Sequence, residues 1–201
     1  MKIAILVEGK TELAFKSHLL NFLNTRLEGK MPKLDFFAYD GRIPKAAKLK
    51  SAVKNYLLKD KYDAVIALTD VYTGTNDFTS AADAKRQMLE WVGSIPHFYP
   101  HVANHDFEAW LLPYWSEIKK LARHNKSAPG NYPEQVNFNK PPSYHIKEMF
   151  LSGKYKRRYK KPRDAHRILR EKDLLISAKA CPELKAFLNR ILQLCEGELI
   201  P

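Results

Sequence analysis

The sequence predicts an α/β protein with a mostly parallel sheet covered by helices on both faces. Two short, continuously apolar segments, at residues 2–7 and 63–69, are typical of strands that are buried on both faces. Each is followed by a longer segment whose apolar residues recur at helical spacing. Alternation of strands and helices along a chain indicates a parallel or mostly parallel sheet.

The predicted elements follow one another without repeats through the first 124 residues. Strands are expected at 2–7, 34–38, 63–69 and 97–102, and helices at 11–27, 45–58, 80–95 and 106–124. Ser80 is expected to cap the third helix, with Asp83 at the position that completes a capping box. Pro113 is expected to distort the fourth helix.

The remainder of the chain differs in composition and predicts a separate unit. Residues 125–142 are rich in Pro, Gly, Asn and Ser, which indicates a loop, and short helices are expected at 143–150, 162–171 and 182–194. We therefore divide the chain into an α/β core (1–124), a loop (125–142) and a small, basic, helical appendage (143–201). Cys181 and Cys195 lie at apolar helical positions and are expected to be buried free thiols.

Composition narrows the class of protein. The chain has 201 residues, 45% of them hydrophobic and 28% charged, which provides enough apolar material for a core and a charged surface. No apolar run approaches the roughly 18 residues that a membrane span needs. The first apolar segment is too short for a signal peptide, so a cytoplasmic protein without a membrane partner is expected.

The net charge of +12 is concentrated in one part of the chain. Between Lys140 and Lys172, twelve Lys and Arg stand against three acids, which places +9 of the net charge there. Residues 154–161 interleave two tyrosines with six cations. Cations neutralise phosphates and aromatic rings stack on unpaired bases, so this segment favours nucleic-acid binding, with a solvated surface as the alternative. The expected contacts are Arg157, Arg158, Lys160 and Lys161.

Two acids follow directly on predicted strands. Glu8 comes after the first strand and Asp70 after the third, and the carboxyl ends of parallel strands meet at one edge of the sheet. Carboxylates brought together repel unless a cation lies between them, and hard oxygen ligands suit Mg²⁺ or Mn²⁺. Such a metal supports phosphodiester hydrolysis. Each acid alone is as readily explained as a helix cap or a solvated loop residue.

The residues around Glu8 fit a phosphate-binding turn. Gly9 allows a close approach of the backbone to a phosphate, and Thr11 can cap the following helix. Glu12 lies one turn into that helix and is expected to reach the same site, while Lys10 is expected to hold phosphates.

A further cluster, at residues 105–108, has two interpretations. His105 and Glu108 are three residues apart, so on a helix they share a face and act together in proton transfer or metal binding. Alternatively, Asn104 caps a helix and the acids only occupy its first turn. Spacing alone does not decide between the two.

The motifs resemble a known family. Val7-Glu8-Gly9-Lys10-Thr11-Glu12 is similar to the first motif of the TOPRIM domain, which topoisomerases, bacterial primases and OLD-family nucleases share. The chain more closely resembles the small TOPRIM-like proteins of domain-of-unknown-function family 4276. The segments that match this family are Asp70-Val71-Tyr72, Asp77-Phe78, His105-Asp106-Phe107-Glu108-Ala109, Leu111-Leu112, Pro133-Glu134, Val136-Asn137, Tyr159-Lys160-Lys161 and Cys181-Pro182.

The resemblance implies a TOPRIM-like fold and a toxic effector nuclease that an ABC-type ATPase regulates in bacterial anti-phage defence, as in the PARIS system. It implies that Glu8, Asp70 and Glu12 form an acidic Mg²⁺ site. Two residues depart from the pattern: Tyr72 replaces the second acid of the TOPRIM Asp-x-Asp, which leaves Asp77 as a candidate third metal ligand, and Asp106 replaces a glutamate.

The sequence therefore predicts a metal-dependent nuclease that acts on RNA or DNA. The predicted catalytic residues are Glu8, Glu12, Asp70, His105 and Glu108, and the predicted metal ligands are Glu8, Asp70 and Asp77. The alternative is a non-catalytic nucleic-acid-binding or regulatory subunit that docks onto an ATPase. A nucleotide-binding enzyme is disfavoured because no G-x-G-x-x-G or Walker loop is present.

Overall fold

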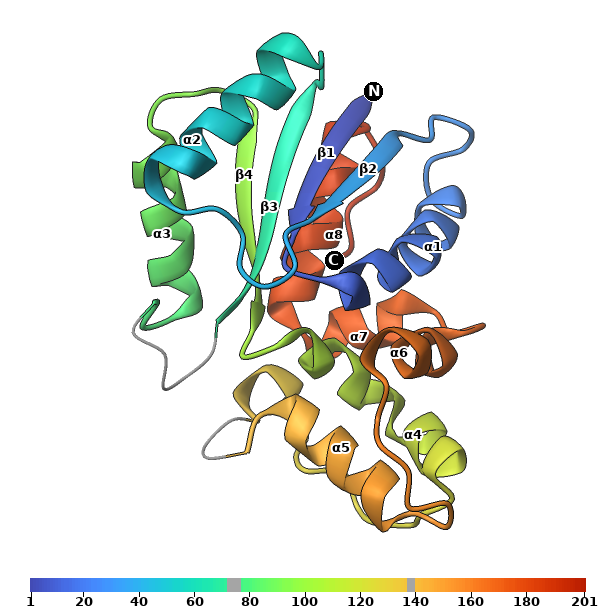
Figure 1. The fold of residues 1–201 in the computed structure, drawn as a ribbon. Helices are drawn as coiled ribbons and strands as arrows, with labels where there is room; N and C mark the ends of the chain where they lie inside the picture. Colours follow the sequence, from blue (N-terminus) through green and yellow to red (C-terminus); the bar gives the residue numbers. More distant parts are fainter. Residues whose placement is uncertain (72–76, 137–139) are drawn as a thin grey trace.

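A four-stranded parallel sheet forms the centre of the protein (Figure 1). The computed structural model describes residues 1–71, 77–136 and 140–201. The strands are β1 (Lys2–Val7), β2 (Lys33–Ala38), β3 (Ala64–Val71) and β4 (Phe98–Asn104), in the spatial order β2-β1-β3-β4. All three strand pairs are parallel, which confirms the predicted sheet and its four strands.

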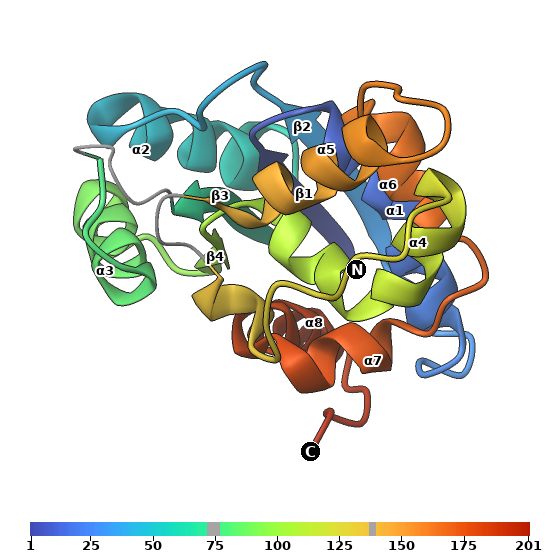
Figure 2. The same ribbon diagram turned by 90° about the horizontal axis from the view of Figure 1, so that it is seen from below.

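Helices cover both faces of the sheet (Figure 2). Alternate residues of a strand point to opposite faces, so a strand covered on both sides must be apolar throughout. In β1, Ala4 and Leu6 pack towards α2 (Ala46–Lys54) and α3 (Ala81–Val92). Ile3, Ile5 and Val7 join the larger core on the opposite face, which includes residues of α1 (Lys10–Asn24) and α8 (Pro182–Leu194). The continuous apolar run at the start of the chain follows from this double burial.

The remaining helices extend the molecule beyond the carboxyl end of the sheet (Figure 1). The exception is η1, a π-helix (Asn55–Lys59) at the opposite end of the sheet. The others are the 3₁₀ helices η2 (Phe107–Tyr114) and η3 (Pro133–Gln135), and the α-helices α4 (Trp115–Ala122), α5 (Pro142–Ser152), α6 (Lys161–Leu169) and α7 (Leu174–Ala180). Buried side chains of α6, α7 and α8 share one core with α1 and β1. Residues 143–201 therefore help to cover the sheet, and the division into core and appendage stays a prediction.

The structure corrects several local predictions. Pro113 lacks an N–H donor, and the segment predicted as one helix is a 3₁₀ helix up to Tyr114 followed by α4. Thr11 does not cap α1, because the helix begins at Lys10 and the extended Gly9 is its N-cap. The predicted cap of α3 is confirmed, since the Ser80 hydroxyl accepts a hydrogen bond from the Asp83 N–H at 3.1 Å. The helix α7 was not predicted from the sequence.

Two further predictions concern the cysteines and the membrane. Cys181 and Cys195 are buried free thiols, as expected. In the described ranges of the chain, no helix is long and apolar enough to cross a membrane.

The strand order creates a crevice between β1 and β3. The connection from β1 leads outward to β2, whereas β3 lies on the other side of β1 and leads on to β4. Loops at the carboxyl ends of β1 and β3 therefore diverge, and this divergence is where parallel sheets bind ligands.

Candidate metal centre

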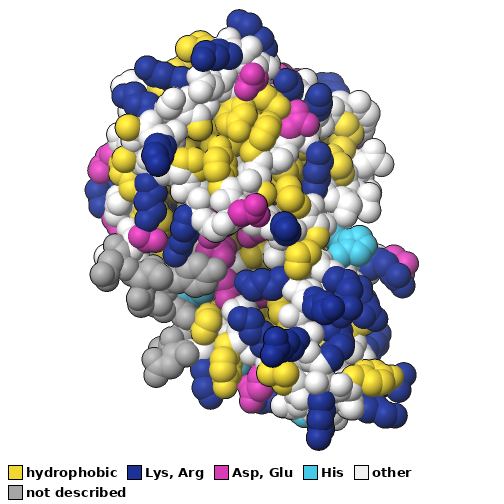
Figure 3. Space-filling model, in the orientation of Figure 1, with side chains coloured by type: hydrophobic (Ala, Val, Ile, Leu, Met, Phe, Trp, Pro, Cys, Tyr) yellow, Lys and Arg dark blue, Asp and Glu magenta, His cyan; other side chains and the backbone are white. Residues whose placement is uncertain are grey.

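A cleft of about 410 Å³ lies in this crevice. Its walls are the turn after β1, the end of β3, the loop after β2 and the first residues of α1 and α6. The lining residues are Glu8, Gly9, Lys10, Thr11, Glu12, Asp40, Gly41, Asp70, Lys161 and Pro162. Acidic side chains are visible here between the upper body and a lower part that is crowded with Lys and Arg (Figure 3).

Glu8 is held in a fixed position by one of its two carboxylate oxygens. Its Oε1 accepts hydrogen bonds from the Thr69 hydroxyl, from the Asp70 N–H at 3.2 Å and from Arg42 Nη1 at 3.4 Å. No hydrogen bond from the described residues reaches Oε2. Burial raises the pKa of Glu8, although these donors act in the opposite direction. The bonds to Oε1 therefore fix the Glu8 carboxylate, and Oε2 can bind a cation.

Glu12 interacts with Glu8, and two further buried acids, Asp106 and Glu108, follow on from Glu12. Burial raises the pKa of Glu12, and the charges of Glu108 and Glu8 raise it further. Burial raises the pKa of Asp106 to about 7, again with a contribution from Glu108. Asp106 and Glu108 are fully buried, and among the described residues neither Asp106 Oδ1 nor Glu108 Oε1 has a hydrogen-bond partner. The acids thus destabilise one another's charged forms.

Two internal cations contact this cluster. Arg42 Nη1 donates to Glu8 and to the Asp70 carbonyl oxygen, the latter at 3.1 Å. Lys161 Nζ donates to Glu108 Oε2 at 3.1 Å. Burial lowers the pKa of Lys161, but Glu108 and Asp106 raise it above its ordinary value, so the ammonium group stays charged.

Asp77 is connected to the cleft through Arg42. Arg42 Nη2 lies 3.5 Å from Asp77 Oδ2, and Lys45 pairs with the other oxygen of the same carboxylate. The hydrogen bond from Lys45 lowers the pKa of Asp77. Asp77 therefore contacts two cations and positions Arg42, while its predicted role as a metal ligand stays a prediction.

The donor set of the cleft fits a hard divalent cation. Three buried acids, Glu8, Glu12 and Asp70, line the cleft, and Asp106 and Glu108 interact with Lys161 at its border. Within the ranges that the structure describes, no three acidic, His or Cys side chains converge as a closed metal site requires. Mg²⁺ commonly takes only one or two protein carboxylates and completes its shell with water and phosphate. The oriented Glu8, with Asp70 beside it in the cleft, suits this open form of binding.

The N-termini of α1 and α6 both border the cleft. Lys10 and Lys161 are the first residues of these helices, and both line the cleft. A helix N-terminus offers free N–H groups and a partial positive charge, which favour a phosphate. The arrangement can therefore bind an anion beside the acidic cluster. Lys10 is exposed, as its predicted phosphate contact requires.

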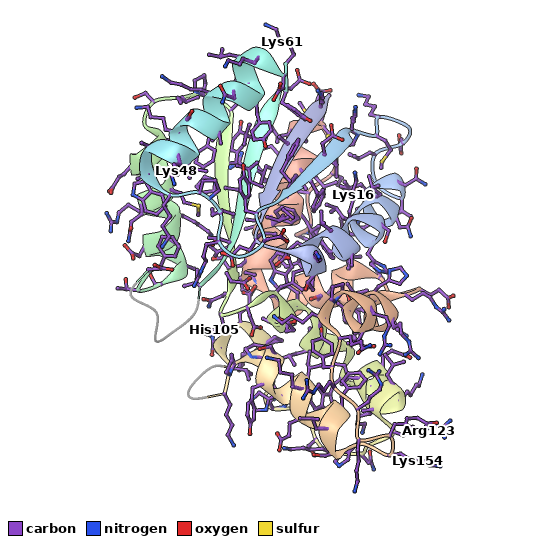
Figure 4. The ribbon with its side chains drawn as sticks, viewed as in Figure 1. Lys16, Lys48, Lys61, His105, Arg123 and Lys154 are labelled. Atoms are coloured by element: carbon purple, nitrogen blue, oxygen red, sulfur yellow. The ribbon has the colours of Figure 1, made fainter. Side chains whose placement is uncertain are left out.

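His105 lies outside this arrangement (Figure 4). The 3₁₀ helix begins at Phe107, so the argument that His105 and Glu108 share a helix face does not apply. His105 has a backbone φ of +71°, and burial lowers its pKa, which leaves the ring neutral. It does not line the cleft, whereas Glu108 borders it through Lys161. A catalytic role for His105 stays a prediction.

Of the four predicted nucleic-acid contacts, two are exposed on the surface and two are partly buried by contacts with acids. Arg158 and Lys160 are exposed. Arg157 is half-buried and forms hydrogen bonds of 2.6 and 3.2 Å with the fully buried Asp164. Lys161 is in the cleft. Tyr159 is buried against Phe150, so the prediction that both tyrosines of the segment can stack on bases is wrong for Tyr159.

Comparisons with known proteins identify the family and the fold. Residues 7–192 match the family described as "Domain of unknown function (DUF4276)". The chain belongs to this family. A solved structure of the C-terminal region of the Burkholderia pseudomallei OLD protein is similar, with a TM-score of 0.57 and 13% identity over 96% of this chain and 98% of that one. A solved structure of the C-terminal region of the Xanthomonas campestris pv. campestris OLD protein has a TM-score of 0.49 and 14% sequence identity, over 96% of this chain and 95% of that one. No curated protein matches the chain.

For this DUF4276 protein, the similarity to the Burkholderia structure shows a shared fold, of the type found in OLD C-terminal regions. Sequence reasoning alone missed Arg42, Thr69 and Asp106 as members of the site. Arg42 belongs to the loop after β2, and no pattern connects it with Glu8. Asp106 could have been found, because it lies between His105 and Glu108, which the sequence had already singled out. Tyr72 and Asn137 lie outside the described residues.

Proposed function

We propose that this protein is a metal-dependent nuclease that hydrolyses phosphodiester bonds of RNA or DNA. The observation that supports this most directly is the group of buried carboxylates, Glu8, Glu12 and Asp70, in a cleft that also has two helix N-termini and Lys161. Such a surplus of acids favours binding of a divalent cation, and the helix ends favour a phosphate beside it. The coarse similarity to OLD C-terminal regions agrees with this proposal.

Each residue has a separate role in the proposed reaction. Glu8 and Asp70 would hold Mg²⁺ or Mn²⁺, which when bound supplies Lewis-acid activation of the phosphodiester. Lys161 binds a phosphate oxygen and offsets the charge that develops on it. Glu12 accepts the proton of the attacking water, because burial and its acidic neighbours raise its pKa and make it a stronger base. As the water oxygen bonds to phosphorus, the bond from phosphorus to the leaving sugar oxygen breaks, and that oxygen takes a proton from solvent. Glu108 orients the Lys161 ammonium group.

The test is cleavage of labelled RNA and DNA by purified protein in Mg²⁺, Mn²⁺ or EDTA. Glu8→Gln and Asp70→Asn should abolish cleavage, with unchanged circular dichroism. Glu90→Gln is a matched control, because Glu90 is an exposed acid that pairs only with Arg86 in the described structure. Unfolding of Glu8→Gln would indicate a structural role for Glu8 instead. Cleavage that persists in both site variants would refute the proposed centre.

A role as a toxic effector in anti-phage defence, regulated by an ATPase partner, is a proposal that rests on the family resemblance. Production without the partner, or after the partner is triggered, should be toxic and accompanied by cleaved cellular RNA or DNA. Toxicity should disappear in both Glu8→Gln and Asp70→Asn. If either variant stays fully toxic, the catalytic interpretation fails, and a non-catalytic module that docks onto an ATPase becomes the better explanation.

A further inference from the structure

The segment that joins α5 to α6 has an alternating pattern of exposure. Lys156, Arg158 and Lys160 are exposed. Between them, Arg157 turns inward to Asp164, and Tyr159 is buried against Phe150. The backbone at Lys160 is extended, so Tyr159 and Lys160 point to opposite sides, whereas Lys156, with a backbone φ of +42°, lies in the turn before them. The three exposed cations follow one another along the segment. They form a row that ends beside Lys161 in the cleft.

These three cations differ from many others on the surface. In the described part of the structure, none of them forms an ion pair. Arg86, in contrast, is paired with Asp83 and Glu90, and Lys126 is paired with Glu148. A row of cations without acidic partners is available to bind phosphates.

An exposed aromatic ring stands at the other end of the row. Tyr155 is 56% exposed, and the Arg123 guanidinium lies 5.2 Å from its ring centroid. The backbone beneath it is fixed, because the Lys154 N–H donates to the Ala122 carbonyl oxygen at 3.2 Å. Figure 4 shows Arg123 and Lys154 at the end of the molecule away from Lys61. A fixed, exposed ring beside a cation suits stacking of an unpaired base.

We propose that residues 155–161 form a track for an unpaired nucleic-acid strand, with a base stacked on Tyr155 and phosphates bound by Lys156, Arg158 and Lys160. The six steps from Tyr155 to Lys161 span at most about 20 Å of extended chain. A strand on this track therefore reaches the cleft within several nucleotides. The track deepens the proposed nuclease function, since it names a single-stranded substrate, and it explains why the basic segment runs directly into the site.

The experiment measures binding without cleavage. Fluorescence anisotropy of wild-type protein in EDTA compares single strands and duplexes of one sequence, as RNA and as DNA. Tyr155→Ala should weaken binding of single strands about tenfold or more, because one stacked base is lost. Tyr155→Phe should bind as the wild type does. Duplex binding should change less than about twofold with either variant.

A second arm tests the phosphates. The triple variant K156Q/R158Q/K160Q should lower the slope of log affinity against log salt by about 2 for single strands. The matched control is K48Q/K59Q/K61Q, three exposed lysines of α2, η1 and the turn that follows. The control should leave the slope unchanged within about half a unit. Equal effects of both triples would show that only net charge matters, and would overturn the track.

Failure of the track and failure of the nuclease are distinguishable. If Tyr155→Ala binds single strands like the wild type, or if duplexes bind more tightly than single strands, the track is wrong even where cleavage is found. If the track variants behave as expected but no cleavage occurs in Mg²⁺ or Mn²⁺, the nuclease is wrong and the binding surface remains. Comparison of the RNA and DNA arms identifies the sugar that is preferred.

Discussion

Arg157 and Arg158 are neighbours in the sequence, yet their substitution by alanine should affect stability very differently. Arg157 donates two hydrogen bonds to Asp164, at 2.6 and 3.2 Å, and its guanidinium lies 4.1 Å from the Phe150 ring centroid. Asp164 is fully buried. Removal of one partner of a buried ion pair typically costs about 3–5 kcal/mol. Because Arg163 and the Lys160 N–H still reach Asp164, we expect about 2–3 kcal/mol for Arg157→Ala.

The measurement is the free energy of unfolding in urea, with thermal unfolding as a second assay. A loss of this size should lower Tm by roughly 5–10 °C in a chain of this length. Arg158→Ala is the matched control, because Arg158 is exposed, and it should stay within about 0.5 kcal/mol of the wild type. A difference between the two variants below about 0.5 kcal/mol would refute the structural role of Arg157.

The same pair predicts a pH dependence. Burial alone raises the pKa of Asp164, but hydrogen bonds from Arg157 and the Lys160 N–H lower it below its usual value. A lowered pKa stabilises the fold above the unfolded pKa of about 3.9, and this contribution disappears as the pH falls through the folded pKa. The stability difference between wild type and Arg157→Ala should therefore narrow below about pH 4. A difference that stays constant to acid pH would contradict the assignment.

Three further predictions concern the cleft and the base of the track. Saturating Mn²⁺, at about a hundred times its Kd, should stabilise the wild type by roughly 2.7 kcal/mol in thermal unfolding, and should not stabilise Glu8→Gln. Asp106, with a pKa raised to about 7, favours the fold at acid pH and loses that contribution as the pH rises. Asp106→Asn should therefore flatten the decline in urea stability between about pH 4 and 7. Gly153→Ala should cost more than about 3 kcal/mol in urea, because its Cβ would collide with the Ala122 carbonyl oxygen.

The sheet and the placement of Glu8 could be predicted from the sequence because both depend on local patterns. A strand that is buried on both faces is apolar along most of its length, as β1 is from Ile3 to Val7 and β3 from Ala64 to Leu68. An acid directly after such a strand must lie at the carboxyl edge of the sheet. Glu8 and Asp70 were found in this way, and both line the cleft.

Other parts of the site depend on contacts that no local pattern reveals. The pair between Lys161 and Glu108 joins residues 53 positions apart, and Arg42 reaches Glu8 across 34 positions. The burial of Tyr159 could not be predicted, because its neighbours in the sequence are all cations, and this composition indicated that the whole segment is exposed. Only the alternation of exposure along the segment separates Arg157 and Tyr159 from Arg158 and Lys160.

The distance along the chain between Glu8 and Lys161 has a consequence for synthesis of the protein in a cell. The cleft is lined by the first turn of α1 and by the first residues of α6, which packs against α1. A ribosome adds about 5–20 residues per second, so the acids emerge many seconds before Lys161 does. Until α6 has left the exit tunnel and docked, a growing chain has the acids of the cleft but lacks Lys161 and the N-terminus of α6. Unfinished chains, including those released early from a damaged message, are therefore expected to lack the proposed nuclease activity.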